Sequence, residues 1–123
     1  MLRLVQRAGQ AAFLAIEGAF NKAFGDQQNP FYSLGAIANY LLWVVGASGL
    51  YLYIFFATGV SEAYESVEQL THGQWWLGGI LRSFHRYASD AMVLAMVLHL
   101  VRHYVFDHYR SFRWFSWVSG LIL

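Results

Sequence analysis

The distribution of apolar and polar residues predicts two membrane-spanning helices, at about residues 35–57 and 77–104. The first stretch contains no charged side chain and is long enough to cross a bilayer. The second is mostly apolar, and Arg82 and Arg102 lie near its two ends, twenty residues apart. At the rise of an α-helix that separation is about 30 Å, the thickness of the hydrocarbon core. The arginines therefore mark the two boundaries of the second span.

Residues 1–24 have a different pattern, which predicts an amphipathic helix on the membrane surface. A signal peptide is the alternative, but Glu17 interrupts its apolar run and no clear small-x-small cleavage site follows. Gly25 and Pro30 end this segment, since glycine can terminate a helix and proline cannot continue one. Polar residues at helical spacing are Arg3, Arg7, Gln10, Glu17 and Asn21, with Val5, Phe13, Ile16, Phe20 and Phe24 opposite them.

The segments outside the spans predict the orientation of the chain. The loop at residues 57–77 contains three glutamates and neither lysine nor arginine, whereas both terminal segments are basic. Because lysine and arginine favour the cytoplasmic side, we expect the N-terminus to be cytoplasmic and the loop to lie on the outer side. The polar spacing within the loop predicts a short surface helix, with Trp75 and Trp76 as interface anchors. A third span starts at about residue 114, and its ten residues reach part of the way through the core.

Composition supports an all-α integral membrane bundle and excludes several other classes. Hydrophobic residues make up 58% of the 123 residues and charged residues 12%, well below the charged fraction of soluble domains. The net charge of +1, with no basic run, gives no indication of a nucleic-acid partner. The chain has no cysteine, which excludes disulfides, thiolate metal sites and a thioether-linked haem.

Two histidines within the second span suggest its chemistry. His85 and His99 are fourteen residues apart. On a helix this interval returns to within about 40° of the starting direction and covers about 21 Å, so both imidazoles lie on one stripe, each about one turn inside a membrane face. Imidazole is an axial ligand of haem iron, and the planar guanidinium groups of Arg82 and Arg102 can form paired hydrogen bonds with haem propionates. A single intramembrane histidine is often a hydrogen bonder between helices, and terminal arginines often snorkel, but the paired spacing favours two stacked haems.

Glycines in the first span repeat the same interval. Gly35 and Gly49 are also fourteen residues apart, which places two bare patches on one side of the helix where a flat ligand could lie. Glycine is also common in membrane helices because it permits close helix packing, and Gly46 does not fit the interval. The matching histidine interval favours the ligand interpretation.

For two further polar residues of the second span, Asp90 and His103, the sequence allows two roles each. A buried carboxylate at Asp90 is expected to be neutral or hydrogen-bonded to a neighbouring helix, and a proton relay is the alternative. His103 lies one turn beyond His99 and is expected to be a hydrated interfacial side chain, with a quinone head group or a propionate as the alternative contact.

With these residues in view, the chain resembles the N-terminal part of cytochrome b from quinol-oxidising bc and bf complexes, most closely the split b6-type and related bacterial forms. The resemblance implies that His85 and His99 each give one axial bond to one of two b haems. It also implies that Arg82 and Arg102 approach the propionates. The similarity covers nearly all of residues 30–123, most clearly at NPFYSLG, GVSEAYESVEQL, GGILRSFHRYAS, MVLHLVRHY and RWFSWVSG.

The resemblance extends to the glycines, with two departures. It implies that Gly35 and Gly49 lie where the haems pass, and that Gly120 is the first of a similar pair on the third helix. In the b6-type proteins a cysteine before the first glycine anchors an extra haem, whereas this chain has Ser33, so no covalent haem is expected. The family takes the opposite axial histidines from a fourth helix. We therefore expect this chain to be part of a longer subunit, the alternative being completion of the bundle by a second polypeptide.

The function that this resemblance implies is electron transfer. Quinol would give one electron to an iron-sulfur protein and one to the outer haem at His85, and the second electron would pass to the haem at His99 and then to a quinone. The implied partners are a Rieske-type iron-sulfur protein, a c-type cytochrome, membrane lipid and the remainder of the bundle, in a dimeric complex of a bacterial inner membrane. The alternatives are a haem b subunit of a hydrogenase or formate dehydrogenase, a pigment-binding antenna subunit, and an anchor without a cofactor.

Overall fold

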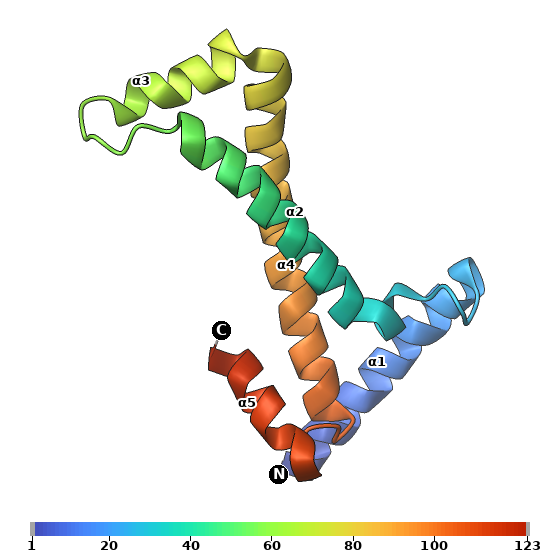
Figure 1. Ribbon diagram of the computed structural model, residues 1–123. Helices are drawn as coiled ribbons and strands as arrows, with labels where there is room; N and C mark the ends of the chain where they lie inside the picture. Colours follow the sequence, from blue (N-terminus) through green and yellow to red (C-terminus); the bar gives the residue numbers. More distant parts are fainter. Residues whose placement is uncertain (1, 123) are drawn as a thin grey trace. The chain divides into compact units, whose positions relative to one another are not determined.

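The computed structural model describes residues 2–122, and within this range the chain is helical and contains no strand (Figure 1). This confirms the all-α prediction. Four short stretches of 3-10 or π-helix link the α-helices in the part of the chain that the structure describes. In chain order the elements are α1 (Leu2–Phe24), a 3-10 turn (Pro30–Ser33), α2 (Leu34–Phe55), α3 (Ala63–Glu68), π-helical turns (Gln69–Gly73 and Trp75–Gly79), α4 (Ile80–Val105), a 3-10 turn (Ser111–Arg113) and α5 (Trp114–Ile122).

Within these residues, one helical stretch is both long and apolar enough to cross a membrane. It is Pro30–Phe55, with 26 residues and a mean hydropathy of 1.5. Helix α4 also has 26 residues, which cover about 39 Å along its axis. Its composition is more polar, since Arg82, Arg86 and Asp90 fall within it. Polar groups on a helix of spanning length commonly mark function, which directs attention to α4.

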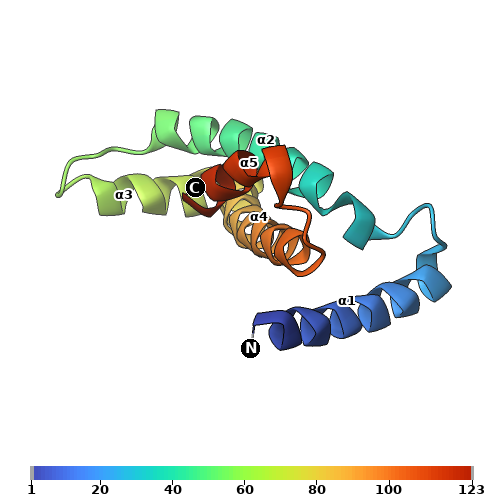
Figure 2. The same ribbon diagram turned by 90° about the horizontal axis from the view of Figure 1, so that it is seen from below.

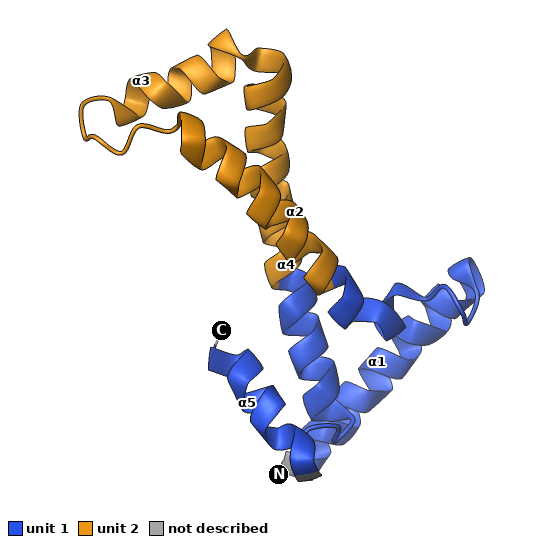
Figure 3. Ribbon diagram, in the orientation of Figure 1, with its two compact units in different colours: residues 1–37, 94–123 blue, residues 38–93 orange. Residues whose placement is uncertain are grey.

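The chain forms two compact units, residues 1–37 with 94–123 and residues 38–93 (Figure 3). The first unit contains α1, the start of α2, the C-terminal part of α4, and α5. The second contains the rest of α2, α3 and the N-terminal part of α4. Many large apolar side chains of α2 and α4 are exposed, as expected of helices that face lipid; examples are Tyr40, Trp43, Leu50, Tyr53, Ile54, Val93 and Leu94.

In the first unit, α1 packs its polar face against the chain and leaves apolar side chains exposed. Gln10 Nε2 donates to the Val105 carbonyl at 2.8 Å, and Gln6 Nε2 donates to Asp107 Oδ1 at 3.0 Å. Phe13 differs from the expected pattern, because it is buried with the polar residues and meets Phe31 edge-on at 6.4 Å. It follows Gln10 by three residues and so shares that face. Leu4, Val5, Leu14 and Ile16 are exposed, an arrangement suited to an apolar surrounding.

The turn after α1 is organised by one asparagine. Gly25 ends the helix with a φ of +79°, a conformation that glycine adopts without strain. Asn29 is 1% exposed, and its Nδ2 donates to the Glu17 carbonyl at 3.1 Å and to Asn21 Oδ1 at 2.5 Å. Its Oδ1 accepts from the Phe31 amide at 3.0 Å and so caps the following turn. Every polar atom of this side chain is therefore used.

Substituting Asn29→Ala is expected to destabilise the first unit. The change removes these three hydrogen bonds and leaves the part-buried Phe31 amide without its acceptor, a loss of about 1–3 kcal/mol. Thermal unfolding of the purified protein measures the effect. Asn39→Ala is the matched control, because Asn39 is exposed on α2. Equal unfolding temperatures for the two variants would contradict this role of Asn29.

In the second unit, the chain returns from α2 to α4 through α3 and the two π-helical turns (Figure 2). Helix α3 lies within the predicted loop at residues 57–77. Leu70 is buried, and a Cβ at Gly78 would lie 2.5 Å from the Leu70 carbonyl oxygen, so the backbone can approach there only because residue 78 has no side chain. Trp75 and Trp76 are exposed, and their role as interface anchors stays a prediction.

Candidate haem sites

The first candidate site consists of His85, Ser48, Gly49 and Arg82 in the second unit, and it is called the outer site, as the other is called the inner site, after the orientation that the sequence predicts. Its histidine has a defined hydrogen bond. His85 Nδ1 lies 2.8 Å from Ser48 Oγ, and Ser48 Oγ lies 2.7 Å from the Val44 carbonyl. The carbonyl can only accept, so it takes the single hydroxyl proton, and Oγ then accepts from Nδ1–H. This arrangement assigns the proton of His85 to Nδ1 and leaves the lone pair of Nε2 available to a metal.

Each histidine is pressed against one of the two predicted glycines. A Cβ at Gly49 would lie 3.0 Å from His85 Cε1 in the second unit. In the first unit, a Cβ at Gly35 would lie 2.9 Å from His99 Cε1. The contact at Gly35 is shorter than real side chains make, and the contact at Gly49 is tighter than nearly all of them, so each ring occupies space that a side chain at the glycine would need. The two fourteen-residue intervals in the sequence therefore correspond to two histidine–glycine pairs.

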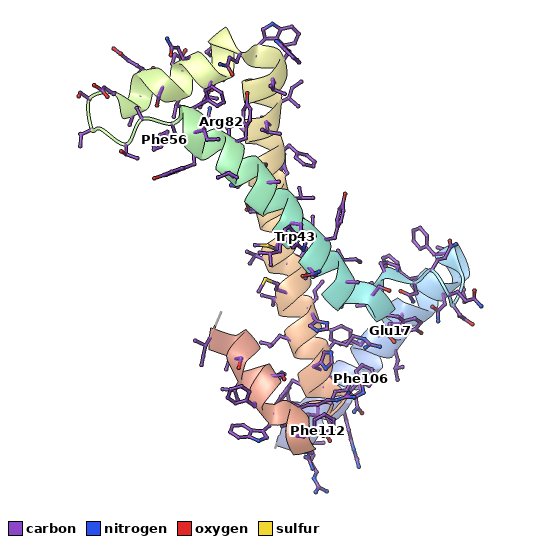
Figure 4. All side chains as sticks on the ribbon, viewed as in Figure 1. Glu17, Trp43, Phe56, Arg82, Phe106 and Phe112 are labelled. Atoms are coloured by element: carbon purple, nitrogen blue, oxygen red, sulfur yellow. The ribbon has the colours of Figure 1, made fainter. Side chains whose placement is uncertain are left out.

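A cavity of about 270 Å³ adjoins His85 in the outer site. Its wall is mostly apolar, and Leu52, Phe56 and Leu70 contribute to it beside Gly49 and Arg82. Arg82 NH1 donates to Thr71 Oγ1 at 2.8 Å, and Figure 4 labels Arg82 and Phe56 in this part of the second unit. The outer site thus combines an imidazole, an apolar wall and one cation.

The inner site, formed by His99, His103, Gly35 and Gly120 in the first unit, has a larger cavity. Its volume is about 600 Å³, and its wall includes His99, His103 and Gly120. The ring centroids of His99 and His103 are 4.4 Å apart, so both imidazoles border the same space. A Cβ at Gly120 would meet only Leu100 Cδ1, at 3.6 Å. The sequence predicted His99 and Gly120 as site residues and left the role of His103 open.

Two residues lining the inner cavity were missed as site residues. His108 and Arg113 follow the predicted span, so their spacing gave no indication that they face His99. The turn at Asp107 places both residues at the inner cavity, and its φ of +58° is unusual for a residue other than glycine. The His108 ring lies 5.3 Å from the ring of His103. The available signal was the aspartate two residues after the end of α4, since aspartate tolerates this conformation.

Arg102 is held on the side of α1, and it is not among the residues lining the inner cavity. Its Nε donates to Glu17 Oε1 at 2.7 Å, and the two side chains are 18% and 5% exposed. The guanidinium carbon also lies 5.6 Å from the centre of the Tyr32 ring and 5.1 Å from that of Phe106. The expected contact of Arg102 with a propionate stays a prediction.

The residues of both sites suit a haem. Each site offers one imidazole as an axial ligand, a glycine that keeps a helix bare beside it, and a largely apolar cavity that accepts a flat ring. Arginine at each site can receive a carboxylate, Arg82 at the outer cavity and Arg113 at the inner one. At the inner cavity, His103 and His108 are further imidazoles beside His99.

Comparison with known proteins connects this geometry to a family. The profile of the family described as cytochrome b/b6/petB matches residues 20–123. Cytochrome b6 of Synechococcus sp. (strain JA-3-3Ab) is 34% identical over 108 residues, which are 88% of this chain and 50% of that protein. Cytochrome b6 of Heterocapsa triquetra is 37% identical over 95 residues, 77% of this chain and 43% of that protein.

A third relative agrees with these two. Cytochrome b6 of Mastigocladus laminosus is 35% identical over 95 residues, which are 77% of this chain and 44% of that protein. The chain spans about half the length of the curated relatives it matches. The family is one of integral membrane proteins that bind haem b, and the matched region contains every residue of the two sites. On this similarity, and with the helical fold beside it, the chain belongs to the cytochrome b family.

Proposed function

We propose that this chain carries two b haems across a membrane and passes electrons between quinol oxidation and quinone reduction in a bc-type complex. The observation that supports the proposal most strongly is the pairing of His85 with Gly49 and of His99 with Gly35. The same fourteen-residue interval on α2 and on α4 generates both pairs. Family membership supports haem b and a membrane complex, while the number of haems and the quinone belong to the proposal.

The residues of the chain have distinct parts in this function. Haem b, when bound, supplies reversible one-electron chemistry at iron. His85 lines the outer cavity, and its hydrogen bond with Ser48 holds the proton on Nδ1, which leaves Nε2 free to bind iron. His99 borders the inner cavity, and the bare backbone at Gly35 leaves room for its ring. The protein contributes fixed positions, exclusion of water and charge near the iron.

The orientation and the partners complete the proposal. The acidic loop at residues 57–77 and the basic terminal segments favour a cytoplasmic N-terminus, which places His85 toward the outer face and His99 toward the inner one. A Rieske-type iron-sulfur protein and a c-type cytochrome would accept electrons on the outer side, in a dimeric complex of a bacterial inner membrane. A quinone at the inner side would receive the electron from the haem at His99.

A reduced-minus-oxidised absorption spectrum of the purified complex tests the proposal. Two b-type haem signals with separable midpoint potentials are expected, because the two sites differ in their neighbouring charges and hydrogen bonds. A spectrum without redox change, or one with chlorophyll-like bands, would overturn it.

Ser48→Ala is expected to weaken the outer haem selectively. Loss of the hydroxyl frees Nδ1 of His85 to change tautomer and lets the ring turn, and loss of such a supporting contact lowers metal affinity roughly 10- to 100-fold. Haem content and midpoint potential, measured by redox titration of the absorption bands, report the effect. Ser48→Thr keeps the hydroxyl and should restore the outer haem, and Ser83→Ala is the matched control on α4. An unchanged outer haem in Ser48→Ala would show that this hydrogen bond has no part in ligation.

A further inference from the structure

We propose that Glu17 of α1 is a positioning residue for Arg102 and lowers the midpoint potential of the inner haem through its charge. The inference rests on the proposed function, since it requires a haem at His99. It assigns the N-terminal surface helix a part in tuning electron transfer in addition to its packing.

The contact between Glu17 and Arg102 is close and shielded from solvent. Glu17 Oε1 accepts from Arg102 Nε at 2.7 Å, and the two side chains are 5% and 18% exposed. A charge-assisted hydrogen bond of this length is among the stronger contacts available to an arginine. The residues are 85 positions apart in the sequence, so the contact arises from packing of α1 within the first unit.

The same contact orients the guanidinium of Arg102. Glu17 uses the single Nε–H, so the four N–H groups of the two terminal nitrogens remain available to another acceptor. The rings of Tyr32 and Phe106 lie 5.6 and 5.1 Å from the guanidinium carbon and restrict its movement. Asn29 in turn donates to the Glu17 carbonyl at 3.1 Å and holds this turn of α1 in place.

Arg102 of the ion pair is a neighbour of the inner ligand on α4. Arg102 follows His99 by three residues on α4, and residues at this interval are neighbours on a helix surface. A nearby positive charge favours the ferrous form of an iron, and a nearby negative charge favours the ferric form. Because charges act more strongly in a medium of low dielectric, a carboxylate at Glu17 offsets the effect of Arg102 and lowers the midpoint potential.

Glu17→Gln in the assembled complex tests the inference. Glutamine has nearly the same shape and can still accept the Nε hydrogen bond, so the substitution removes the charge and keeps the packing. Redox titration of both b-haem bands is expected to show an upward shift of the inner potential, an unchanged outer potential and full haem content. Glu65→Gln is the control, because Glu65 is exposed in the second unit, and both potentials should stay at their original values.

Other results would overturn the inference. An unchanged inner potential in Glu17→Gln, or equal shifts of both haems, would show that the charge does not act on the inner site. Loss of haem from Glu17→Gln would show that Glu17 maintains the fold and does not tune the potential. Glu17→Asp keeps the charge and should shift the inner potential less than glutamine does, and an equal shift would overturn the inference too. Absence of two b haems from the unaltered complex would instead refute the proposed function.

Discussion

His99→Ala is expected to abolish the inner b-haem signal while the outer haem remains, and His85→Ala is expected to do the reverse. Each substitution removes the imidazole that the proposal assigns to the iron of its site. His103 and His108 also line the inner cavity, so loss of the inner signal in His99→Ala would distinguish His99 from these two neighbours. Alanine favours helix, so α4 should still form and insert. Reduced-minus-oxidised spectra with redox titration measure the loss, which should be nearly complete for one haem in each variant.

His72→Ala provides the control for both histidine variants. His72 lies in the loop between α3 and α4, exposed and 3.3 Å from Glu68, and should not affect either haem. If both haem bands persisted unchanged in His85→Ala and in His99→Ala, the assignment of these residues as ligands would be wrong.

Gly49→Val is expected to deplete the outer haem, and Gly35→Val the inner one. A Cβ at either position would lie within 3.0 Å of the histidine ring, so the imidazole has to move, and its movement disrupts ligation. Overpacking of this kind also costs about 1–3 kcal/mol of stability. Haem content per protein, read from the separate haem bands, measures the effect.

Helix α2 contains a matched control for the glycine variants. Gly46 is three residues before Gly49, and a Cβ there would meet nothing within 4 Å. Gly46→Val should therefore keep both haems, although the restricted χ1 angle of valine affects helix stability equally at the two positions. Equal loss of haem from Gly46→Val and Gly49→Val would indicate a general effect on α2 and contradict a specific contact with His85.

Local patterns were sufficient to predict the helices and the paired positions within them. Helix α2 at Leu34–Phe55 and α4 at Ile80–Val105 lie within a few residues of the predicted spans. The histidine and glycine intervals depend only on helix geometry, so they could be predicted before any packing was known. The sequence pattern missed that each glycine makes room for the histidine ring itself, because that contact depends on how two helices meet.

The contacts that could not be predicted join distant parts of the chain. Ser48 precedes Gly49 and has no sequence signal of its own, yet its hydroxyl determines which nitrogen of His85 is free. The sequence pattern assigned Glu17 to the polar face of a surface helix, whereas it is buried against Arg102. The orientation of α1 explains this difference, since its polar face packs against protein and its apolar face is exposed.

A high-resolution density map of the assembled complex would test most directly whether α4 presents two haem ligands. The map is expected to show two porphyrin rings, one with its iron bonded to His85 Nε2 beside Gly49 and one with its iron bonded to His99 beside Gly35. Density that shows the two imidazoles bound to other side chains, with no porphyrin beside either, would contradict the haem assignment.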